Sequence, residues 1–289
     1  MIELSVVLPV RNAEAVIGPQ LAAVAAQLDR SRCELIVVDD ASTDATPDVL
    51  AATAHDDPRI EVLSVPERRG VNHARNAGLT VARGSKVLFC DSDDVVAEGW
   101  LSAMSQALDD WDLVFGALDE RRLNPPEFRI GHHFEVETQT TTRAMGFLPR
   151  GMGCNLGVRL DVARAVGGFD DSLRYGGTDT DFCWRVQLAG HVPYYAADAV
   201  VHYRHPRTLR ELARKRFLQG MQHGYLYRKF RSAGMRRRSV RSVIRHVLGV
   251  VVRAPLAWRT TRSRRRWVES LSRFAGLIVG SIRHRTLYL

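Results

Sequence analysis

Strand-like apolar runs alternate with segments of helical periodicity through the first 120 residues, and this alternation constrains the fold more than any other feature. Apolar runs predict buried strands at residues 4–9, 33–38, 60–65 and 86–90. Helical spacing predicts helices at residues 13–28, 49–54 and 74–82. Strands that alternate with helices in this way imply a parallel sheet between two helical layers, a three-layer, Rossmann-like α/β/α domain.

Carboxylates directly follow two of these strands. Asp39 and Asp40 end the second strand, and Asp91 and Asp93 follow the fourth within the segment DSDD. Open α/β sheets bind ligands at the carboxyl ends of their strands. A D-x-D pair offers the hard oxygen ligands that Mg²⁺ and Mn²⁺ prefer. A lone D-x-D is more often a solvated loop, but two acidic strand ends in one domain favour a binding site.

Periodicity weakens in the second half of the chain. A helix is predicted at residues 100–108 and a strand at 112–118, but residues 119–142 are polar and aperiodic. We expect an irregular or antiparallel insertion there, over one edge of the sheet. Short elements then resume, with helices predicted at 161–166 and 180–190 and a last strand at 200–201.

Charge is divided unevenly along the chain. Residues 206–289 hold 22 Lys and Arg but only two Glu, a net charge of +20, whereas residues 1–205 hold 19 basic and 30 acidic residues, a net charge of −11. Helical patterns at 207–230, 239–253 and 264–281 predict that the basic part is a mainly helical C-terminal extension. It should lie on an anionic membrane surface. The equal alternative is that it covers the first domain or forms a contact in a homo-oligomer.

The cysteines and the N-terminal sequence bear on location. The four cysteines lie far apart with no CxxC pair, which argues against a zinc knuckle or a disulfide scaffold. Met1 leads directly into the first strand pattern, without the pattern of a secretory signal. No uncharged apolar run reaches the roughly 18 residues of a membrane-spanning helix. We expect a cytoplasmic protein, peripheral on the inner face of the cell membrane.

The segments LPVRN at 8–12, VDDASTDAT at 38–46, GVNHARNAG at 70–78 and DSDD at 91–94 occur in that order. Together they resemble the successive motifs of family 2 glycosyltransferases with the GT-A fold. GGFD at 167–170 matches a further motif of that family, and DTDFCWR at 179–185 stands where its ED-x-D-x-x-x-R segment would. Thr178 replaces the Glu of that segment, which leaves the role of this neighbour in doubt. The resemblance covers about the first 205 residues.

The resemblance implies an inverting transfer of a sugar from a nucleotide-diphosphate sugar, with UDP favoured, to a hydroxyl of a glycan or lipid-linked acceptor. It assigns the general base to Asp179, since a carboxylate can take the proton of the attacking hydroxyl. It also implies a divalent ion, Mn²⁺ or Mg²⁺, on the leaving diphosphate. The expected metal ligands are Asp91, Asp93 and His202.

The remaining site residues follow from the same motifs. The donor nucleotide is expected to contact Pro9, Arg11, Asn12, Glu14, Asp39, Asp40, Asn72, Arg75, Asp91 and Ser92. Among these, Arg75 has the planar fork that suits phosphate oxygens. Gly153, Trp184 and Arg185 are expected on the acceptor side, where residues 119–150 should shape the cleft.

Several of these residues have a structural alternative. Asp44 is favoured as a helix cap rather than a ligand, and Asp170 and Asp181 as residues that serve a turn and a helix start. The alternative for His202 is a satisfied core or interface histidine. For Trp184, a core position on its helix is as well supported as a contact with the acceptor sugar.

Three rival functions are less consistent with the sequence. A nucleic-acid-binding protein would use the arginine-rich extension, but its aromatic residues follow helical spacing and the acidic domain would have no purpose. A nicotinamide-dependent enzyme would need GxGxxG after the first strand, where the chain reads PVRNAE. A catalytically inactive binding protein is suggested only by Thr178, because Asp93, Asp179 and His202 are all retained.

Overall fold

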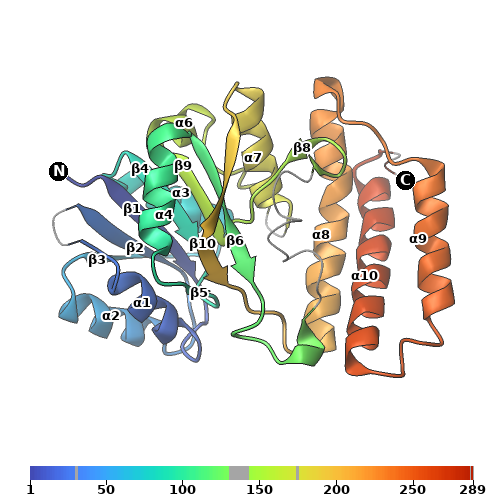
Figure 1. Cartoon of the computed structure of the whole chain (residues 1–289), viewed down its shortest axis with the longest axis horizontal. Helices are drawn as coiled ribbons and strands as arrows, with labels where there is room; N and C mark the ends of the chain where they lie inside the picture. Colours follow the sequence, from blue (N-terminus) through green and yellow to red (C-terminus); the bar gives the residue numbers. More distant parts are fainter. Residues whose placement is uncertain (30–31, 130–142, 174–175, 287, 289) are drawn as a thin grey trace.

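The computed structural model describes residues 1–29, 32–129, 143–173, 176–286 and 288 (Figure 1). They include a mixed eight-stranded sheet in the order β3-β2-β1-β4-β9-β6-β10-β5. Its strands are β1 (Leu4–Val10), β2 (Cys33–Asp40), β3 (Ile60–Val65), β4 (Lys86–Cys90), β5 (Val95–Val96), β6 (Leu113–Asp119), β9 (Asn155–Arg159) and β10 (Pro193–His202). The predicted α/β class is confirmed.

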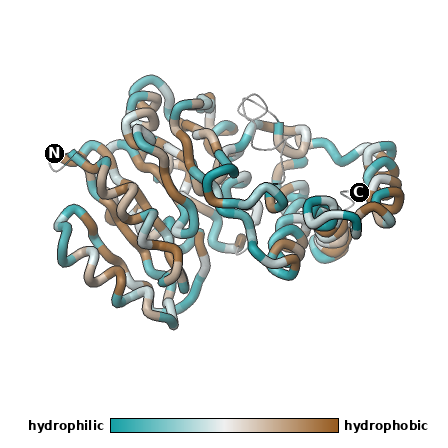
Figure 2. The backbone as a smooth tube through the Cα atoms, turned by 60° about the horizontal axis from the view of Figure 1, so that its bottom comes forward, coloured by the Kyte–Doolittle hydropathy of each residue, from teal (hydrophilic) through white to brown (hydrophobic). Residues whose placement is uncertain are grey.

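Helices cover both faces of this sheet. One apolar cluster joins the strands to α1 (Ile17–Ala25), α2 (Thr46–Asp56) and α4 (Trp100–Asp110). A second cluster joins the other face to α3 (Val71–Val81), α6 (Leu160–Ala165) and α7 (Thr178–Leu188). Strands covered on both faces bury every side chain, so β1 and β2 are mostly apolar. The buried polar side chains of Ser5 and Glu34 bond to each other. Figure 2 shows these apolar strands at the centre of the domain.

The expectation of a parallel sheet is wrong for two strands. β9 runs antiparallel to both of its neighbours, β4 and β6, and β5 runs antiparallel to β10. An antiparallel strand needs no crossover helix, so the alternation of strands and helices in the sequence does not predict it. The reversal has a consequence for function. Cys90 at the end of β4 pairs with Asn155 at the start of β9, so residues 151–154 lie beside the DSDD segment.

Asn155 connects the strands around this point. Its amide donates to the carbonyl oxygens of Ala117 and Ala199 over 2.7 and 2.8 Å, and its side-chain oxygen accepts from the indole N–H of Trp100 over 2.8 Å. The side chain is fully buried. A buried amide satisfied in this way fixes the relative positions of β6, β9 and β10.

The segment between β6 and β9 is only partly described. The 3₁₀ turn η1 (Pro126–Phe128) and a hairpin of β7 (Arg143–Ala144) and β8 (Leu148–Pro149) lie within the described residues. Most of the predicted insertion, residues 130–142, lies outside them.

The C-terminal region consists of α8 (Leu209–Phe230), the short turn η2 (Arg231–Ala233), α9 (Val240–Arg253) and α10 (Thr261–Arg283). In Figure 1, α8 lies nearest the sheet, α10 beside it and α9 farthest out. A capping box at Thr208 and Glu211 fixes the start of α8. Among the described residues, no helix combines the length and apolar composition that a membrane crossing requires.

An ion-pair network fastens α8 to the first domain. Lys229 lies 2.8 Å from a carboxylate oxygen of Asp170 and 2.6 Å from one of Asp181. Although its partial burial raises the pKa of Asp170, hydrogen bonds from Lys229, Ser172 and Tyr225 bring the net pKa below its usual value. Asp170 and Asp181 therefore have the structural roles favoured by the sequence, and they hold the turn and α7 against α8.

Glycines allow α8 and α10 to pack unusually closely. Gly220 and Gly224 on α8 face Gly276 and Gly280 on α10, and a Cβ atom on any of the four would meet backbone atoms of the opposite helix. The two pairs have the G-x-x-x-G spacing that brings helix backbones together. This contact is the main interface within the C-terminal region.

Substituting Gly276 with Ala tests the close packing. The new Cβ would overlap the carbonyl oxygen of Phe217, which as backbone cannot move aside alone. We expect the free energy of unfolding to fall by about 1–3 kcal/mol. The control is Gly249→Ala on α9, where nothing lies within 4 Å of the added Cβ; it should be neutral or stabilising by up to about 1 kcal/mol. Urea denaturation measures both, and equal effects would contradict the packing account.

Candidate active site

One large cavity lies at the carboxyl ends of the strands. Its volume is about 1240 Å³, and its walls come from both the α/β domain and the C-terminal helices. Ligand pockets of about 300–1,000 Å³ hold one small molecule, so this cavity has room for two substrates. Ten of the predicted site residues line it: Pro9, Arg11, Asn12, Asp40, Arg75, Asp91, Ser92, Asp93, Gly153 and Asp179.

The ends of β1 and β2 form one end of the cavity. Arg11 donates to the carbonyl oxygens of Asp40 and Ala41 over 2.6 and 2.8 Å, which holds the two strand ends together. The carboxylate of Asp40 accepts hydrogen bonds from the backbone N–H groups of Arg69 and Gly70. Asp40 therefore positions the loop before α3 and still faces the cavity.

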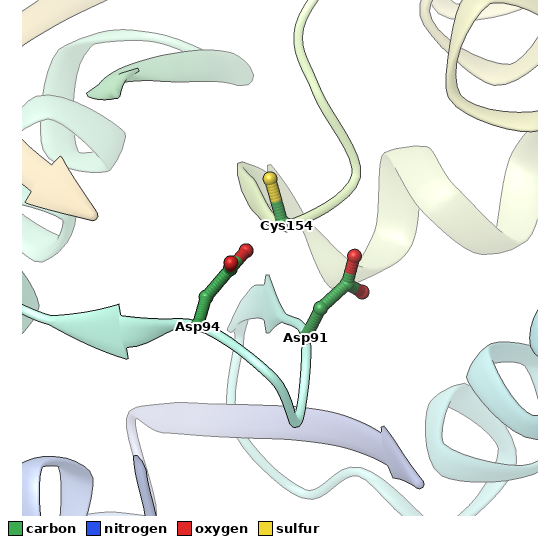
Figure 3. Close-up of side chains that lie close together, drawn as sticks. All are labelled: Asp91, Asp94 and Cys154. Carbon is green, nitrogen blue, oxygen red and sulfur yellow. The ribbon is translucent and has the colours of Figure 1, made fainter. Parts of the chain in front are cut away.

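The DSDD segment places two of its carboxylates close to each other and to the thiol of Cys154. Ligand atoms of Asp91, Asp94 and Cys154 all lie within 4.8 Å of one another (Figure 3). Asp94 is fully buried, and one of its oxygens has no hydrogen-bond partner. Burial, followed by the charges of neighbouring aspartates, raises the pKa of both Asp93 and Asp94. A cation beside this segment would offset the repulsion between the carboxylates.

The donor atoms in this segment fit a divalent cation such as Mn²⁺ or Mg²⁺. These ions prefer oxygen ligands, and Asp91 and Asp93, which line the cavity, provide them. Burial raises the pKa of the Cys154 thiol well above its usual value. Because the thiolate is the form that binds metals, Cys154 is better described as a small buried side chain.

Arg75 connects the acidic segment with the opposite wall. Its guanidinium donates to a carboxylate oxygen of Asp91 over 2.8 Å. It also lies against Gly153, where a Cβ atom would come within 2.6 Å of it. The backbone N–H of Gly153 in turn donates to the carboxylate of Asp179 over 3.2 Å. The contact between Arg75 and Gly153 therefore lies between the acidic segment and Asp179.

Asp179 lies in the first turn of α7, where helix N–H groups favour a negative charge. Gly177 precedes the helix in a left-handed conformation with φ of 73°, which glycine adopts without strain. One oxygen of Asp179 accepts from the N–H of Thr180, and Arg150 lies 3.8 Å from the other. Thr178, at the position of the absent Glu, also lines the cavity.

Six predicted site residues do not line the cavity. Glu14 accepts from the N–H of Ala45, and Asp39 accepts from Ser42, so both stabilise the loop after β2. Asn72 is buried and donates to the carbonyl oxygens of Asp170 and Leu173. None of these three side chains lines the cavity, and their direct contact with the nucleotide stays a prediction.

Trp184 and Arg185 on α7 also lie outside the cavity lining. Trp184 is fully buried and donates to the carbonyl oxygen of Leu148, so its core alternative applies. Arg185 pairs with Asp181 and donates to the carbonyl oxygens of Val166 and Gly168. Both side chains bond to backbone packed against α7, and their contact with an acceptor stays a prediction.

His202 lies outside the cavity lining, and its role as a metal ligand stays a prediction. It ends β10 and lies 3.0 Å from a carboxylate oxygen of Asp119 at the end of β6. It is not among the cavity-lining residues that include Asp91 and Asp93. The side chain that follows it, Tyr203, faces the cavity and accepts a hydrogen bond from Lys215 over 2.6 Å. Because side chains alternate along a strand, adjacent residues face opposite sides.

Sequence reasoning missed the part of the cavity that the C-terminal helices form. The missed lining residues include Lys215, Arg216, Gln219 and His223 of α8, Arg236, Arg237 and Arg238 before α9, Ser242 and His246 of α9, and Arg273 of α10. The excess of basic residues was the available signal. Their convergence on the cavity depends on tertiary packing, which spacing within one helix does not reveal.

Comparisons with known proteins identify the family. The model of glycosyl transferase family 2 matches residues 5–164, more than half of the chain. The chain belongs to glycosyl transferase family 2. It is 31% identical over 226 residues to the pre-mycofactocin glycosyltransferase of Mycobacterium tuberculosis, covering 75% of this chain and 46% of that protein. It thus spans about half the length of that relative.

Three further similarities extend over more of the matched protein. Glycosyltransferase AglE of Haloferax volcanii is 30% identical over 226 residues, which cover 75% of this chain and 71% of AglE. Mannosyltransferase PcManGT of Pyrobaculum calidifontis, solved with GDP-Man and Mn²⁺, superposes with a TM-score of 0.67 at 19% identity, over 96% of this chain and 86% of that one. S. aureus TarS with UDP superposes with a TM-score of 0.56 at 17% identity, over 100% of this chain and 93% of that one. These structures confirm the GT-A fold of this family.

Removing carboxylates from the DSDD segment tests the metal site. We expect Mn²⁺ together with a nucleoside diphosphate to raise the melting temperature of the wild type, because a ligand that binds only the folded state stabilises it. In Asp91→Asn/Asp93→Asn the Mn²⁺-dependent part of this rise should disappear. His202→Gln is the matched control and should retain it. A full Mn²⁺ response in the double variant would place the cation elsewhere.

Proposed function

We propose that this chain catalyses the inverting transfer of a sugar from a nucleotide-diphosphate sugar to an acceptor hydroxyl. The observation that carries the proposal is the shared cavity, in which Asp91 and Asp93 lie on one side of the Arg75–Gly153 contact and Asp179 on the other. Inversion needs a base on the face of the anomeric carbon opposite the leaving group. Membership of family 2 and the GT-A fold are consistent with this assignment.

Asp179 is proposed as the general base. Its carboxylate takes the proton from the acceptor hydroxyl while the oxygen of that hydroxyl bonds to the anomeric carbon and the bond to the diphosphate breaks. Arg150, 3.8 Å away, and the N–H of Gly153 orient the carboxylate toward the cavity. Asp179 is partly exposed there, as a group that must reach a substrate requires.

The donor is proposed to lie between β1, β2 and the DSDD segment. Asp91 and Asp93 would hold a divalent cation, which supplies charge neutralisation for the departing diphosphate. Arg75 donates a hydrogen bond to Asp91 and so orients its carboxylate. A uridine nucleotide is the favoured donor, because Asp40 can still accept a base N–H after its bonds to Arg69 and Gly70.

Asp179→Asn tests the role of the base. The amide keeps the shape of the side chain but accepts a proton poorly, so sugar transfer should fall by at least about a hundredfold. Nucleotide affinity in the presence of Mn²⁺ should change less than about threefold, because Asp179 lies outside the donor end. Radiolabelled transfer and isothermal titration calorimetry measure the two quantities. Asp161→Asn, on the surface helix α6, is the control, and retention of transfer by Asp179→Asn would refute the assignment.

We also propose that α9 docks the enzyme on an anionic membrane surface. Its exposed apolar side chains recur at helical spacing and continue into the following turn: Val240, Ile244, Val247, Leu248, Val251, Val252, Leu256 and Trp258. Exposed arginines, including Arg241, Arg245 and Arg253, flank this face. An apolar stripe bordered by arginines is the pattern of helices that lie in the headgroup region. A homo-oligomer is the competing occupant of this surface.

Introducing negative charge on the apolar stripe tests this docking. Val247→Glu/Val251→Glu should abolish flotation with liposomes that contain phosphatidylglycerol, because two carboxylates would enter the headgroup region. Ser272→Glu on α10 is the control for added charge away from the stripe. Flotation should also weaken in high salt. Unchanged flotation of the double variant would exclude the surface, and a dimer that dissociates in the variant would instead assign it to self-association.

A further inference from the structure

The part of the cavity that faces the C-terminal helices is strongly basic. We call it the cationic annex and define it by Arg150, His223, Arg237, Arg238, His246 and Arg273, all of which line the cavity. The annex begins at the proposed base, because Arg150 lies 3.8 Å from Asp179. It is therefore continuous with the place where an acceptor hydroxyl must lie.

The annex has few negative charges of its own. Glu269 forms ion pairs with both Arg216 and Arg273, each over 2.9 Å, so a single carboxylate is shared by two arginines. Within the described part of the chain, Arg237 and Arg238 form no ion pair; Arg238 contacts only the hydroxyl of Ser242, at 3.5 Å. Like charges held together without counterions repel one another, and a bound anion would remove this cost.

Titration of the buried groups agrees with a positive potential in the annex. Burial, followed by the charges of Arg273, Arg150 and Arg238, lowers the pKa of His223 to about 3. Burial and the charge of Arg216 lower the pKa of Arg273 to about 10. The neighbouring arginines make the charged form of His223 less favourable, and for Arg273 burial and Arg216 outweigh the opposing effect of Glu269.

A second, smaller cavity extends the annex along α9. Its volume is about 270 Å³, and it shares Arg238, Ser242 and His246 with the large one. Arg245 and Arg253 of α9 also line it. α9 therefore presents arginines to these cavities and an exposed apolar stripe to solvent. A ligand with an anionic group and a hydrocarbon chain would match both surfaces.

We infer that the cationic annex binds the phosphate or diphosphate group of a lipid-linked acceptor. The inference rests on the proposed function and names the class of acceptor for the same site. The anionic group lies among Arg237, Arg238 and Arg273, the sugar hydroxyl reaches Asp179, and the hydrocarbon chain leaves along α9 toward the membrane. Arginine forks suit phosphate oxygens because they donate two parallel hydrogen bonds.

Titration calorimetry with soluble probes tests the inference without catalysis. The intact protein is first saturated with Mn²⁺ and a nucleoside diphosphate, so that the donor end is occupied. Geranyl diphosphate, geraniol and inorganic diphosphate are then titrated separately. Geranyl diphosphate should bind more tightly than inorganic diphosphate, because only the former carries the hydrocarbon chain, and geraniol should bind weakly or not at all.

Two variants give the inference its specificity. Arg237→Gln/Arg238→Gln should weaken the binding of geranyl diphosphate at least about tenfold, since each arginine contributes charge-assisted hydrogen bonds to the anion. Arg283→Gln/Arg285→Gln removes the same charge from exposed residues that line neither cavity, and should leave the affinity unchanged. Nucleotide affinity should stay within about twofold of the wild type in both variants.

Three results would overturn the inference. Equal losses in both double variants would mean that net charge alone attracts the probe. Equal affinities for geraniol and geranyl diphosphate would exclude an anion site. A parallel loss of nucleotide affinity would assign these arginines to the donor. If the wild type bound no nucleotide at the first step, the proposed function would fail instead, and the two failures are thus distinguishable.

Discussion

The contact of Arg75 with Asp91 and Gly153 is the interaction on which the site depends. It joins the end of β4 to the loop before β9, and through Gly153 it reaches Asp179 on α7. Three segments far apart in the sequence are thereby held around one cavity. Any side chain at residue 153 would collide with the guanidinium of Arg75. Glycine is therefore required because the two segments lie so close together, and not because the backbone has a positive φ.

The reversed direction of β9 makes this contact available. A parallel strand would begin at the opposite edge of the sheet, and its preceding loop would lie far from the acidic segment. Asn155, which is buried and bonded to three neighbouring elements, fixes the point at which β9 begins. The antiparallel direction of β9 thus brings the loop before this strand into the same cavity as the acidic segment.

The C-terminal helices complete the cavity and are held against the α/β domain. Lys229 bridges Asp170 and Asp181, and the close packing of α10 on α8 brings Arg273 and the annex into position. The chain's uneven charge has a structural explanation in part, because basic helices form one wall of a cavity whose other wall holds the carboxylates of Asp40, Asp91, Asp93 and Asp179. The exposed stripe of α9 is the part that the packing leaves without a partner.

Much of this arrangement could be predicted from the sequence, for stated physical reasons. Buried strands are continuous apolar runs and helices have a period, so the helices and the strands β1 to β4 and β6 were located. The motifs picked out Asp91, Asp93 and Asp179, which line one cavity. The direction of β9 could not be predicted, because an antiparallel insertion leaves the apolar pattern of the sequence unchanged. The sequence could not show that His202 and Asn72 lie outside the cavity lining, because the face of a strand end depends on register and a motif does not show which way an amide points.

The shared cavity can be tested most directly by a crystal structure of the protein with Mn²⁺ and a nucleoside diphosphate, in which anomalous scattering locates the metal. The account predicts an anomalous peak between the diphosphate and the carboxylates of Asp91 and Asp93, with Asp179 facing the same ligand across the Arg75–Gly153 contact. A peak beside His202 and Asp119, or a nucleotide in a cavity that Asp179 does not line, would contradict it.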